Sequence, residues 1–148
     1  MMKLRIGVVL KGGCYIFEVL LNLPVWDFVH SRKFMKEGIR YIKNEQRLDG
    51  SWFGSWAICF TYATWFGLEC LQSIGENYSN SDSCKRGCDF LIEKQREDGG
   101  WGESYRSCEE GVYIQHESSQ VVNTAWAVMG LLIAGYPDEK KIQRGIQV

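Results

Sequence analysis

The sequence predicts an all-α fold, part of an α/α toroid (an α/α barrel) built from repeated pairs of outer and inner helices. Two observations lead to this prediction: a gapless internal repeat, and two long stretches that are apolar on nearly all sides. Repeats of this period indicate stacked supersecondary units, and a helix that is apolar all round is typical of a protein interior. We therefore expect an outer amphipathic helix to alternate with an inner buried one.

The internal repeat aligns residues 37–52 with residues 86–101 at an offset of 49 residues, and a third copy begins at residue 144. Each copy has a glycine, a glutamine 8 residues later and a tryptophan 6 residues after that. These residues are Gly38, Gln46 and Trp52 in the first copy, and Gly87, Gln95 and Trp101 in the second.

The two copies predict the same local structure. In each, apolar residues recur at helical spacing before the glutamine, and an Asp-Gly turn precedes the tryptophan. The glutamine amide is suited to bonding nearby backbone groups while its flat face lies against the indole. We name the pair Gln46 and Trp52 the first clasp, and Gln95 and Trp101 the second clasp, and we predict a structural role for both.

Between the clasps, residues 55–71 and 121–134 predict the inner helices, and Ser118 or Ser119 is the expected N-cap of the second. Residues 75–83 and 102–117 are expected to be connecting loops, and a last helix is expected to begin at Pro137.

Charge and cysteine content exclude several classes of function. Lysine and arginine number 17 against 18 aspartate and glutamate, with a net charge of −1, so no nucleic-acid partner is expected. The six cysteines include no C-x-x-C pair and lie far in sequence from both histidines, so we expect no metal site. We expect the thiols of these cysteines to be reduced. No apolar run in the sequence is long enough to span a membrane.

Several motifs together resemble a known family. The clasps match the QW motif of triterpene cyclases, and residues 54–67, 98–105 and 123–127 resemble the C-terminal half of these enzymes. The similarity is greatest to the oxidosqualene cyclases, the lanosterol synthases in particular. The similarity extends from about residue 32 to residue 148. We assign residues 32–148 to part of the C-terminal α/α-barrel domain of a triterpene cyclase, and we leave residues 1–31 as an unmatched N-terminal stretch.

The resemblance implies a sterol-forming enzyme that cyclises 2,3-oxidosqualene through carbocations and needs no cofactor. It also implies monotopic membrane association at the cytosolic face of the endoplasmic reticulum, or at lipid droplets. In the family, an aspartic acid in an Asp-Cys-Thr-Ala-Glu motif protonates the epoxide. This sequence contains no such motif, so we expect a fragment that is inactive alone.

The resemblance also implies roles for individual residues. Trp56 matches the tryptophan that stabilises the developing cation, so it is the candidate catalytic residue. Tyr62 and Trp65 are candidate substrate-binding residues, although packing within the helix explains them as well. We expect Trp126 to belong to the core.

Two alternatives of other classes stay open at this point. The chain is compatible with a non-catalytic helical repeat module that only binds a partner. A protein prenyltransferase β subunit shares the toroid and a related repeat, but it needs zinc ligands, and the sequence offers no convincing set.

Overall fold

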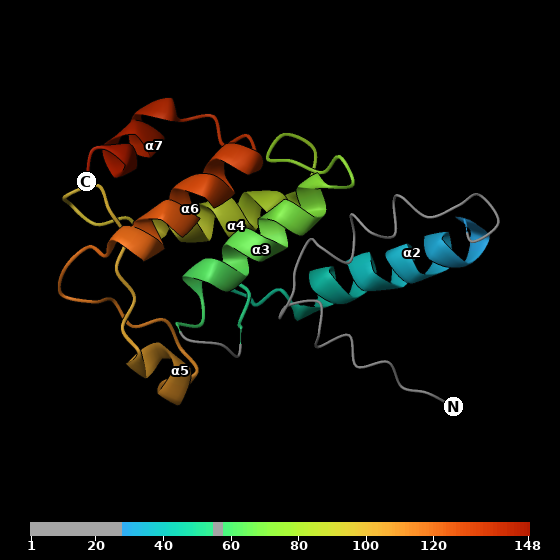
Figure 1. The fold of residues 1–148 in the computed structure, drawn as a ribbon, viewed down its shortest axis with the longest axis horizontal. Helices are drawn as coiled ribbons and strands as arrows, with labels where there is room; N and C mark the ends of the chain where they lie inside the picture. Colours follow the sequence, from blue (N-terminus) through green and yellow to red (C-terminus); the bar gives the residue numbers. More distant parts are fainter. Residues whose placement is uncertain (1–27, 55–57) are drawn as a thin grey trace.

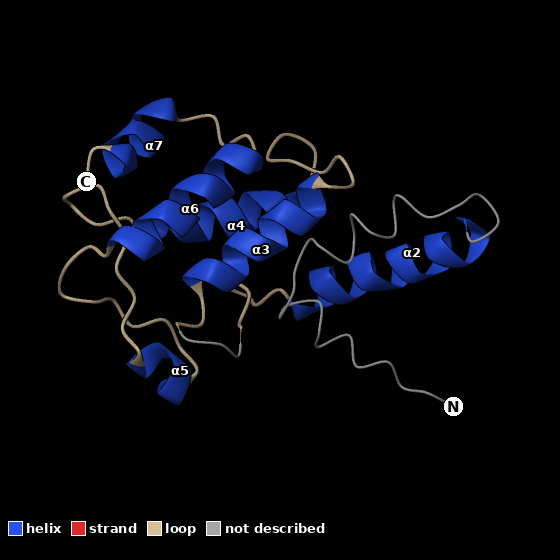
Figure 2. Ribbon diagram, in the orientation of Figure 1, coloured by secondary structure: helices blue, strands red, loops and turns tan. Residues whose placement is uncertain are grey.

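The regular elements of this protein are helices (Figure 2) in the part that the computed structural model describes, residues 28–54 and 58–148. In chain order (Figure 1) they are α2 (Phe28–Glu45), α3 (Thr61–Gln72), α4 (Asp82–Glu93), α5 (Arg106–Glu110), α6 (Val121–Ile133) and α7 (Glu139–Ile146). The predicted all-α class is confirmed, and so is the last helix after Pro137.

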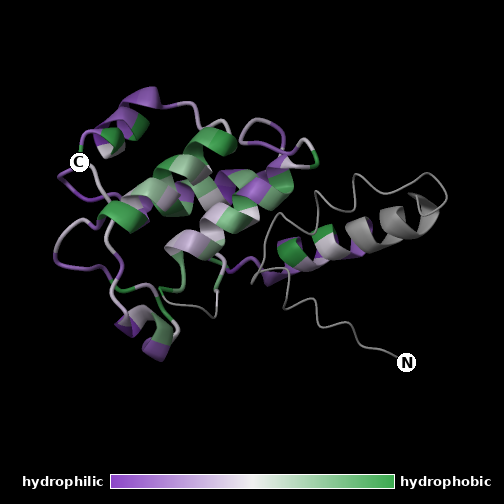
Figure 3. Ribbon diagram, viewed as in Figure 1, coloured by the Kyte–Doolittle hydropathy of each residue, from purple (hydrophilic) through white to green (hydrophobic). Residues whose placement is uncertain are grey.

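The helices form the two layers that the repeat predicts. The inner helices α3 and α6 lie side by side, and α4 packs against both (Figure 1). Gly130 of α6 lies at this contact, where an added Cβ would be 3.4 Å from the Cα of Trp65 in α3. The outer helices α2 and α7 pack against α3 and α6, respectively. Hydrophilic residues cover much of α7, whereas α6 is largely hydrophobic (Figure 3).

The glutamine of each clasp ties its own turn to the next outer helix. Its Nε2 donates one hydrogen bond to the turn that follows it and a second to a residue of the next unit. In the first clasp the acceptors are the carbonyl oxygens of Gly50 and Ser83, both at 2.9 Å. In the second clasp they are those of Gly99 and Lys141, both at 2.8 Å. Each clasp therefore joins two units as well as closing one.

The tryptophan of the first clasp fills the space between three helices. Trp52 is completely buried, and its Nε1 donates a hydrogen bond of 2.7 Å to the carbonyl oxygen of Ile42 in α2. Its indole lies against Gly67 of α3 and Gly87 of α4, where an added Cβ would approach the ring to 2.7 and 3.0 Å. The two glycines make room for the indole, which explains why glycine stands inside both helices.

The Asp-Gly turns adopt the predicted conformation. Gly50 and Gly99 have φ values of +88° and +97°, in the region that favours glycine. The carboxylate of Asp49 accepts a hydrogen bond of 3.0 Å from the backbone N–H of Ser51, as expected of an aspartate in such a turn.

Three local predictions are wrong. The first inner helix begins at Thr61, later than the predicted residue 55, and the predicted loop 102–117 contains the short helix α5. The N-cap of α6 is Gln120, with no side-chain capping bond, and not Ser118 or Ser119; the hydroxyl of Ser119 donates a hydrogen bond to the Asp98 carboxylate.

The inner helices also differ in burial. Most of α3 is buried, as predicted. One face of α6 is open to solvent in the described part of the chain, with Val121 81% and Leu132 56% exposed. Among the described residues, no helix combines the length and apolar character needed to cross a membrane.

Candidate active-site surface

The structure places two of the three candidate site residues. Trp56 lies outside the described residues. Tyr62 and Trp65 both lie in the first half of α3. The side chain of Tyr62 is 3% exposed, and its hydroxyl occupies the space where a Cβ of Gly54 would stand. Trp65 is partly exposed.

Four aromatic side chains from α3 and α6 form one cluster, which we name the aromatic cluster: Tyr62, Trp65, Phe66 and Trp126. Trp65 stacks on Phe66 with ring centroids 4.6 Å apart, and it lies nearly parallel to Trp126 at 6.4 Å. Tyr62 contacts both Phe66 and Trp126 edge-on, at 5.8 Å in each case. Trp126 packs against the hydrophobic core, as predicted, and it also contacts the candidate residues Tyr62 and Trp65.

The cluster has the chemistry of a cation-stabilising surface. Aromatic rings carry negative charge on their faces, and a cation over a desolvated ring gains about 2 kcal/mol or more. Trp65, Phe66 and Trp126 are each partly exposed, so the cluster borders the molecular surface. The buried Nε1 of Trp65 has no hydrogen-bond partner within the described residues.

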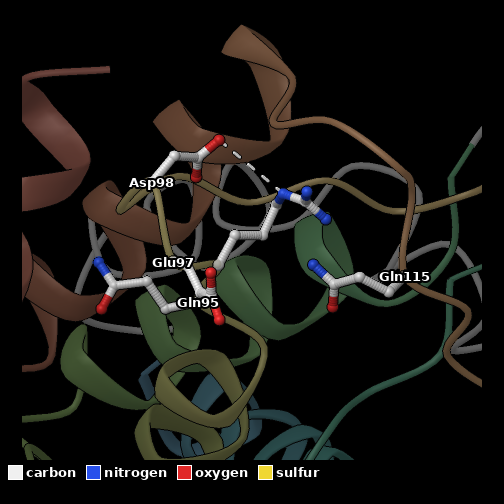
Figure 4. A pocket seen from close by; sticks show the side chains of 5 residues that line it. Gln95, Glu97, Asp98 and Gln115 are labelled. Atoms are coloured by element: carbon white, nitrogen blue, oxygen red, sulfur yellow. Dashed lines mark ion pairs between the residues drawn. The ribbon is translucent and has the colours of Figure 1, made fainter.

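A second surface feature lies at the second clasp (Figure 4). It is a hollow of about 660 Å³ lined by the polar side chains of Gln95, Arg96, Glu97, Asp98 and Gln115. The guanidinium Nε of Arg96 lies 3.9 Å from the Asp98 carboxylate. Hydrogen bonds from the Ser119 hydroxyl and the Gly100 N–H lower the pKa of Asp98. This lining is charged and contains no aromatic ring, so the hollow does not suit a hydrocarbon cation.

A buried carboxylate holds the start of α3. Glu103 is completely buried, and its carboxylate accepts hydrogen bonds of 2.8 Å from the backbone N–H groups of both Phe60 and Thr61. It also accepts a bond of 2.6 Å from the Thr61 hydroxyl. Burial raises the pKa of Glu103, and these hydrogen bonds oppose the rise. Because the first amides of a helix lack partners within it, Glu103 serves as the cap of α3.

A disulfide lies beside this cap and corrects the prediction that all six thiols are reduced. Cys59 and Cys108 are bonded, with their Cα atoms 5.5 Å apart. The prediction holds for Cys84 and Cys88, which are free and buried. Burial raises the pKa of both Cys84 and Cys88, so neither thiol forms the reactive thiolate readily. Cys14 lies outside the described residues.

The sequence contained a signal for the disulfide that the motif analysis did not use. Cys59 and Cys108 are 49 residues apart, the same offset that separates the two copies of the repeat. They therefore occupy equivalent positions after successive clasps. Glu103 likewise follows directly on the second clasp, but nothing in its spacing indicated that it would be buried.

We expect the disulfide to stabilise the fold substantially. Closing a loop of 49 residues reduces the entropy of the unfolded chain, so the paired replacement Cys59→Ser with Cys108→Ser should lower the free energy of unfolding by about 2–4 kcal/mol. Urea unfolding of the oxidised parent, the reduced parent and the double variant measures the effect. Cys70→Ser is the matched control, and equal stability of all oxidised proteins would contradict the prediction.

The comparison with protein families identifies the fold. The family model of the squalene-hopene cyclase C-terminal domain matches residues 15–148. The chain belongs to this family. Its helical architecture is consistent with the all-α fold of this family.

Individual relatives are also similar to this cyclase domain. The chain is 56% identical over 112 residues to lanosterol synthase erg7A of Aspergillus fumigatus, covering 76% of this chain and 15% of that protein. It is 52% identical over 117 residues to lanosterol synthase ERG7 of Saccharomyces cerevisiae, covering 79% of this chain and 16% of that protein. The human lanosterol synthase is 46% identical to the chain over 119 residues, covering 78% of this chain and 16% of that protein. The chain thus spans about one sixth of the length of the curated relatives it matches.

The prenyltransferase alternative requires a set of zinc ligands. Across residues 36–54 and 58–148, no three His, Cys, Asp or Glu side chains gather into a group that could hold a metal ion.

Proposed function

We propose that this chain forms part of the cavity wall of an oxidosqualene cyclase of the lanosterol synthase type. The proposed reaction is the cyclisation of 2,3-oxidosqualene to a sterol precursor through carbocations. The main support is the 46–56% identity to proteins named lanosterol synthase. The proposed setting is the cytosolic face of the endoplasmic reticulum membrane, where the lipid substrate is available.

In this proposal the chain stabilises cations and does not start the reaction. The proposed role of Trp56 is to stabilise the developing positive charge, and the aromatic cluster supplies further ring faces. This stabilisation is differential, because a ring face attracts the charged transition state more than the neutral substrate. Because the cluster borders the surface of this chain, the remaining wall of the cavity has to keep out water, which would otherwise quench the cation. The proton that opens the epoxide comes from an acid outside this sequence.

The experiment is a chimera in which residues 32–148 replace the matching segment of the Saccharomyces cerevisiae lanosterol synthase. The chimera is expressed in yeast cells that lack their own enzyme, and gas chromatography of extracted sterols measures the products. We expect the chimera to form lanosterol. A chimera that accumulates as folded protein but forms no cyclised product would contradict the proposed function.

Variants of Trp56 in the chimera test its catalytic role. Removing a ring face worth about 2 kcal/mol should lower turnover about 30-fold in Trp56→Leu and release incompletely cyclised products. Trp56→Phe keeps a ring face and should retain part of the activity. The fully exposed Leu48 supplies the control Leu48→Ala, which should behave as the parent. Parental turnover in Trp56→Leu would remove this residue from the mechanism.

A further inference from the structure

The backbone of each clasp tryptophan is bonded to an inner helix through a threonine hydroxyl. The N–H of Trp52 donates a hydrogen bond of 3.2 Å to Oγ1 of Thr64 in α3. The N–H of Trp101 donates one of 3.0 Å to Oγ1 of Thr124 in α6. The Thr124 hydroxyl also donates to the carbonyl oxygen of Trp101, at 3.3 Å. Both threonines are buried, 0% and 6% exposed, so water does not compete for these bonds.

The same bond forms although the two units differ in length. Thr64 follows Trp52 by 12 residues, whereas Thr124 follows Trp101 by 23 residues, because α5 and its flanking loops lie between them. The carbonyl groups of a helix are occupied by its own amides, so an N–H that meets the side of a helix needs a side-chain acceptor. A threonine supplies this acceptor in both inner helices, at positions matched in space and not in the repeat.

The threonines stand on the side of each inner helix that is opposite to the aromatic cluster. Successive residues of an α-helix are about 100° apart around its axis. In α3, the three rings of the cluster therefore lie about 100–200° from Thr64, whereas Gly67, which lies against the indole of the first clasp, is about 300° away. In α6, Trp126 is about 200° from Thr124. Each inner helix thus turns one side to a clasp and the other side to the cluster.

Rotation of either inner helix would change how the rings of the cluster meet. The rings of Trp65 and Trp126 are 15° from parallel, with centroids 6.4 Å apart. A rotation of about 20° moves a Cα atom, which lies about 2.3 Å from the helix axis, by about 0.8 Å. Apolar contacts are non-directional, whereas a hydrogen bond weakens steeply as it is bent. The threonine bonds are therefore suited to holding one rotation of each helix.

We propose that Thr64 and Thr124 are positioning residues that fix the rotation of α3 and α6, and with it the ring faces that the aromatic cluster presents to the cations. This proposal rests on the proposed function, and it assigns neither hydroxyl a contact with the substrate. Misplacing a catalytic group by about 1 Å can lower a rate by up to about 100-fold. Loss of either bond should therefore release products in which not all rings have closed.

The test replaces Thr64 within the chimera. Thr64→Val nearly keeps the shape of the side chain and removes the acceptor, whereas Thr64→Ser keeps the hydroxyl. In Thr64→Val we expect the ratio of incompletely cyclised product to lanosterol to rise about tenfold, with KM nearly unchanged. In Thr64→Ser the ratio should stay within about twofold of the parental value, because the hydrogen bond is retained.

A buried serine outside the inner helices supplies the matched control. Ser107 of α5 is 0% exposed, and its hydroxyl accepts a hydrogen bond of 2.9 Å from the backbone N–H of Ile114. Ser107→Ala removes the same type of bond from the loop 102–117. It should lower the melting temperature and keep the parental product ratio, since it leaves the rotation of both inner helices unchanged.

Thr124→Val tests the proposal a second time, through α6 and the second clasp. It should raise the same ratio about tenfold. An inactive parent chimera counts against the proposed function. With an active parent, a folded valine variant that keeps the parental ratio overturns the positioning role of its threonine alone. Failure of both valine variants to fold also overturns the proposal, because it would show that the two bonds serve only stability.

Fluorine NMR provides a measurement that does not depend on activity. The 148-residue chain is labelled with 5-fluorotryptophan, and the variants Trp65→Phe and Trp126→Phe assign the two resonances. Each ring lies close to the face of the other, so in Thr64→Val we expect both resonances to shift. In Ser107→Ala both should stay at their parental positions. Unchanged resonances in Thr64→Val would show that the bond does not set the ring geometry, which overturns the positioning role.

Discussion

The variant Gly50→Ala is expected to lose about 2–6 kcal/mol of its free energy of unfolding, the sum of backbone strain of about 1–3 kcal/mol and overpacking of about 1–3 kcal/mol. Gly50 has a φ of +88°, which a residue with a Cβ adopts only under strain. A Cβ there would also lie 2.2 Å from the carbonyl oxygen of Arg86. Because this neighbour is backbone of α4, the helix itself must move.

The chain supplies a matched control for this prediction. Gly75 has nearly the same φ, +83°, but no atom lies within 4 Å of the place where its Cβ would stand. Gly75→Ala should therefore lose only the cost of the backbone strain, about 1–3 kcal/mol. Urea unfolding followed by tryptophan fluorescence measures both variants. Equal losses at the two positions would show that α4 accommodates the added Cβ at position 50 without cost, and would contradict the prediction.

Truncating the tryptophan of the second clasp should have an effect of similar size. Trp101 is completely buried, and its Nε1 donates a hydrogen bond of 2.6 Å to the carbonyl oxygen of Leu91. Its ring lies against Gly145 of α7, where an added Cβ would be 2.7 Å away. Trp101→Ala should cost about 3–5 kcal/mol, as is typical for a buried aromatic side chain.

The product spectrum distinguishes a structural role of Trp101 from a catalytic one. In the chimera, Trp101→Ala should lower the melting temperature and leave the proportions of the products as in the parent. Trp101→Phe keeps an aromatic ring but loses part of the indole together with its N–H group, so its melting temperature should lie between those of the parent and Trp101→Ala. An altered product ratio at an unchanged melting temperature would place Trp101 in the cavity.

The features that the sequence predicted correctly are those encoded within one unit. Helical periodicity, the Asp-Gly turns and the spacing of glycine, glutamine and tryptophan within one copy all depend on residues less than about 20 positions apart. The structure confirms the helices and turns that these patterns predicted. The identity of residues 54–67 and 98–105 with cyclase motifs extended this to the family. The repeat strengthened the prediction of the helices and turns, since the same pattern of residues occurs in both copies.

The errors arise where the partner is distant in sequence. The start of α3 moved from residue 55 to Thr61 because its amides are capped by Glu103, and periodicity contains no information on such a partner. The same applies to the bond between Cys59 and Cys108. Trp126 packs against the core, as predicted, and its contacts with the candidate residues of α3 are a further pairing across the sequence that hydropathy does not reveal.

The hydrogen bonds between successive units set the order in which the units can be completed during synthesis. The glutamine of the first clasp reaches Ser83, 37 residues later, and that of the second reaches Lys141, 46 residues later. On the ribosome, each helix and its turn therefore emerge well before the backbone that satisfies the clasp. An incomplete unit must persist for several seconds at ordinary elongation rates of about 5–20 residues per second. Each unit is thus finished only by its successor, and a pause in translation between the two would leave a newly made clasp open to misfolding or to recognition by chaperones.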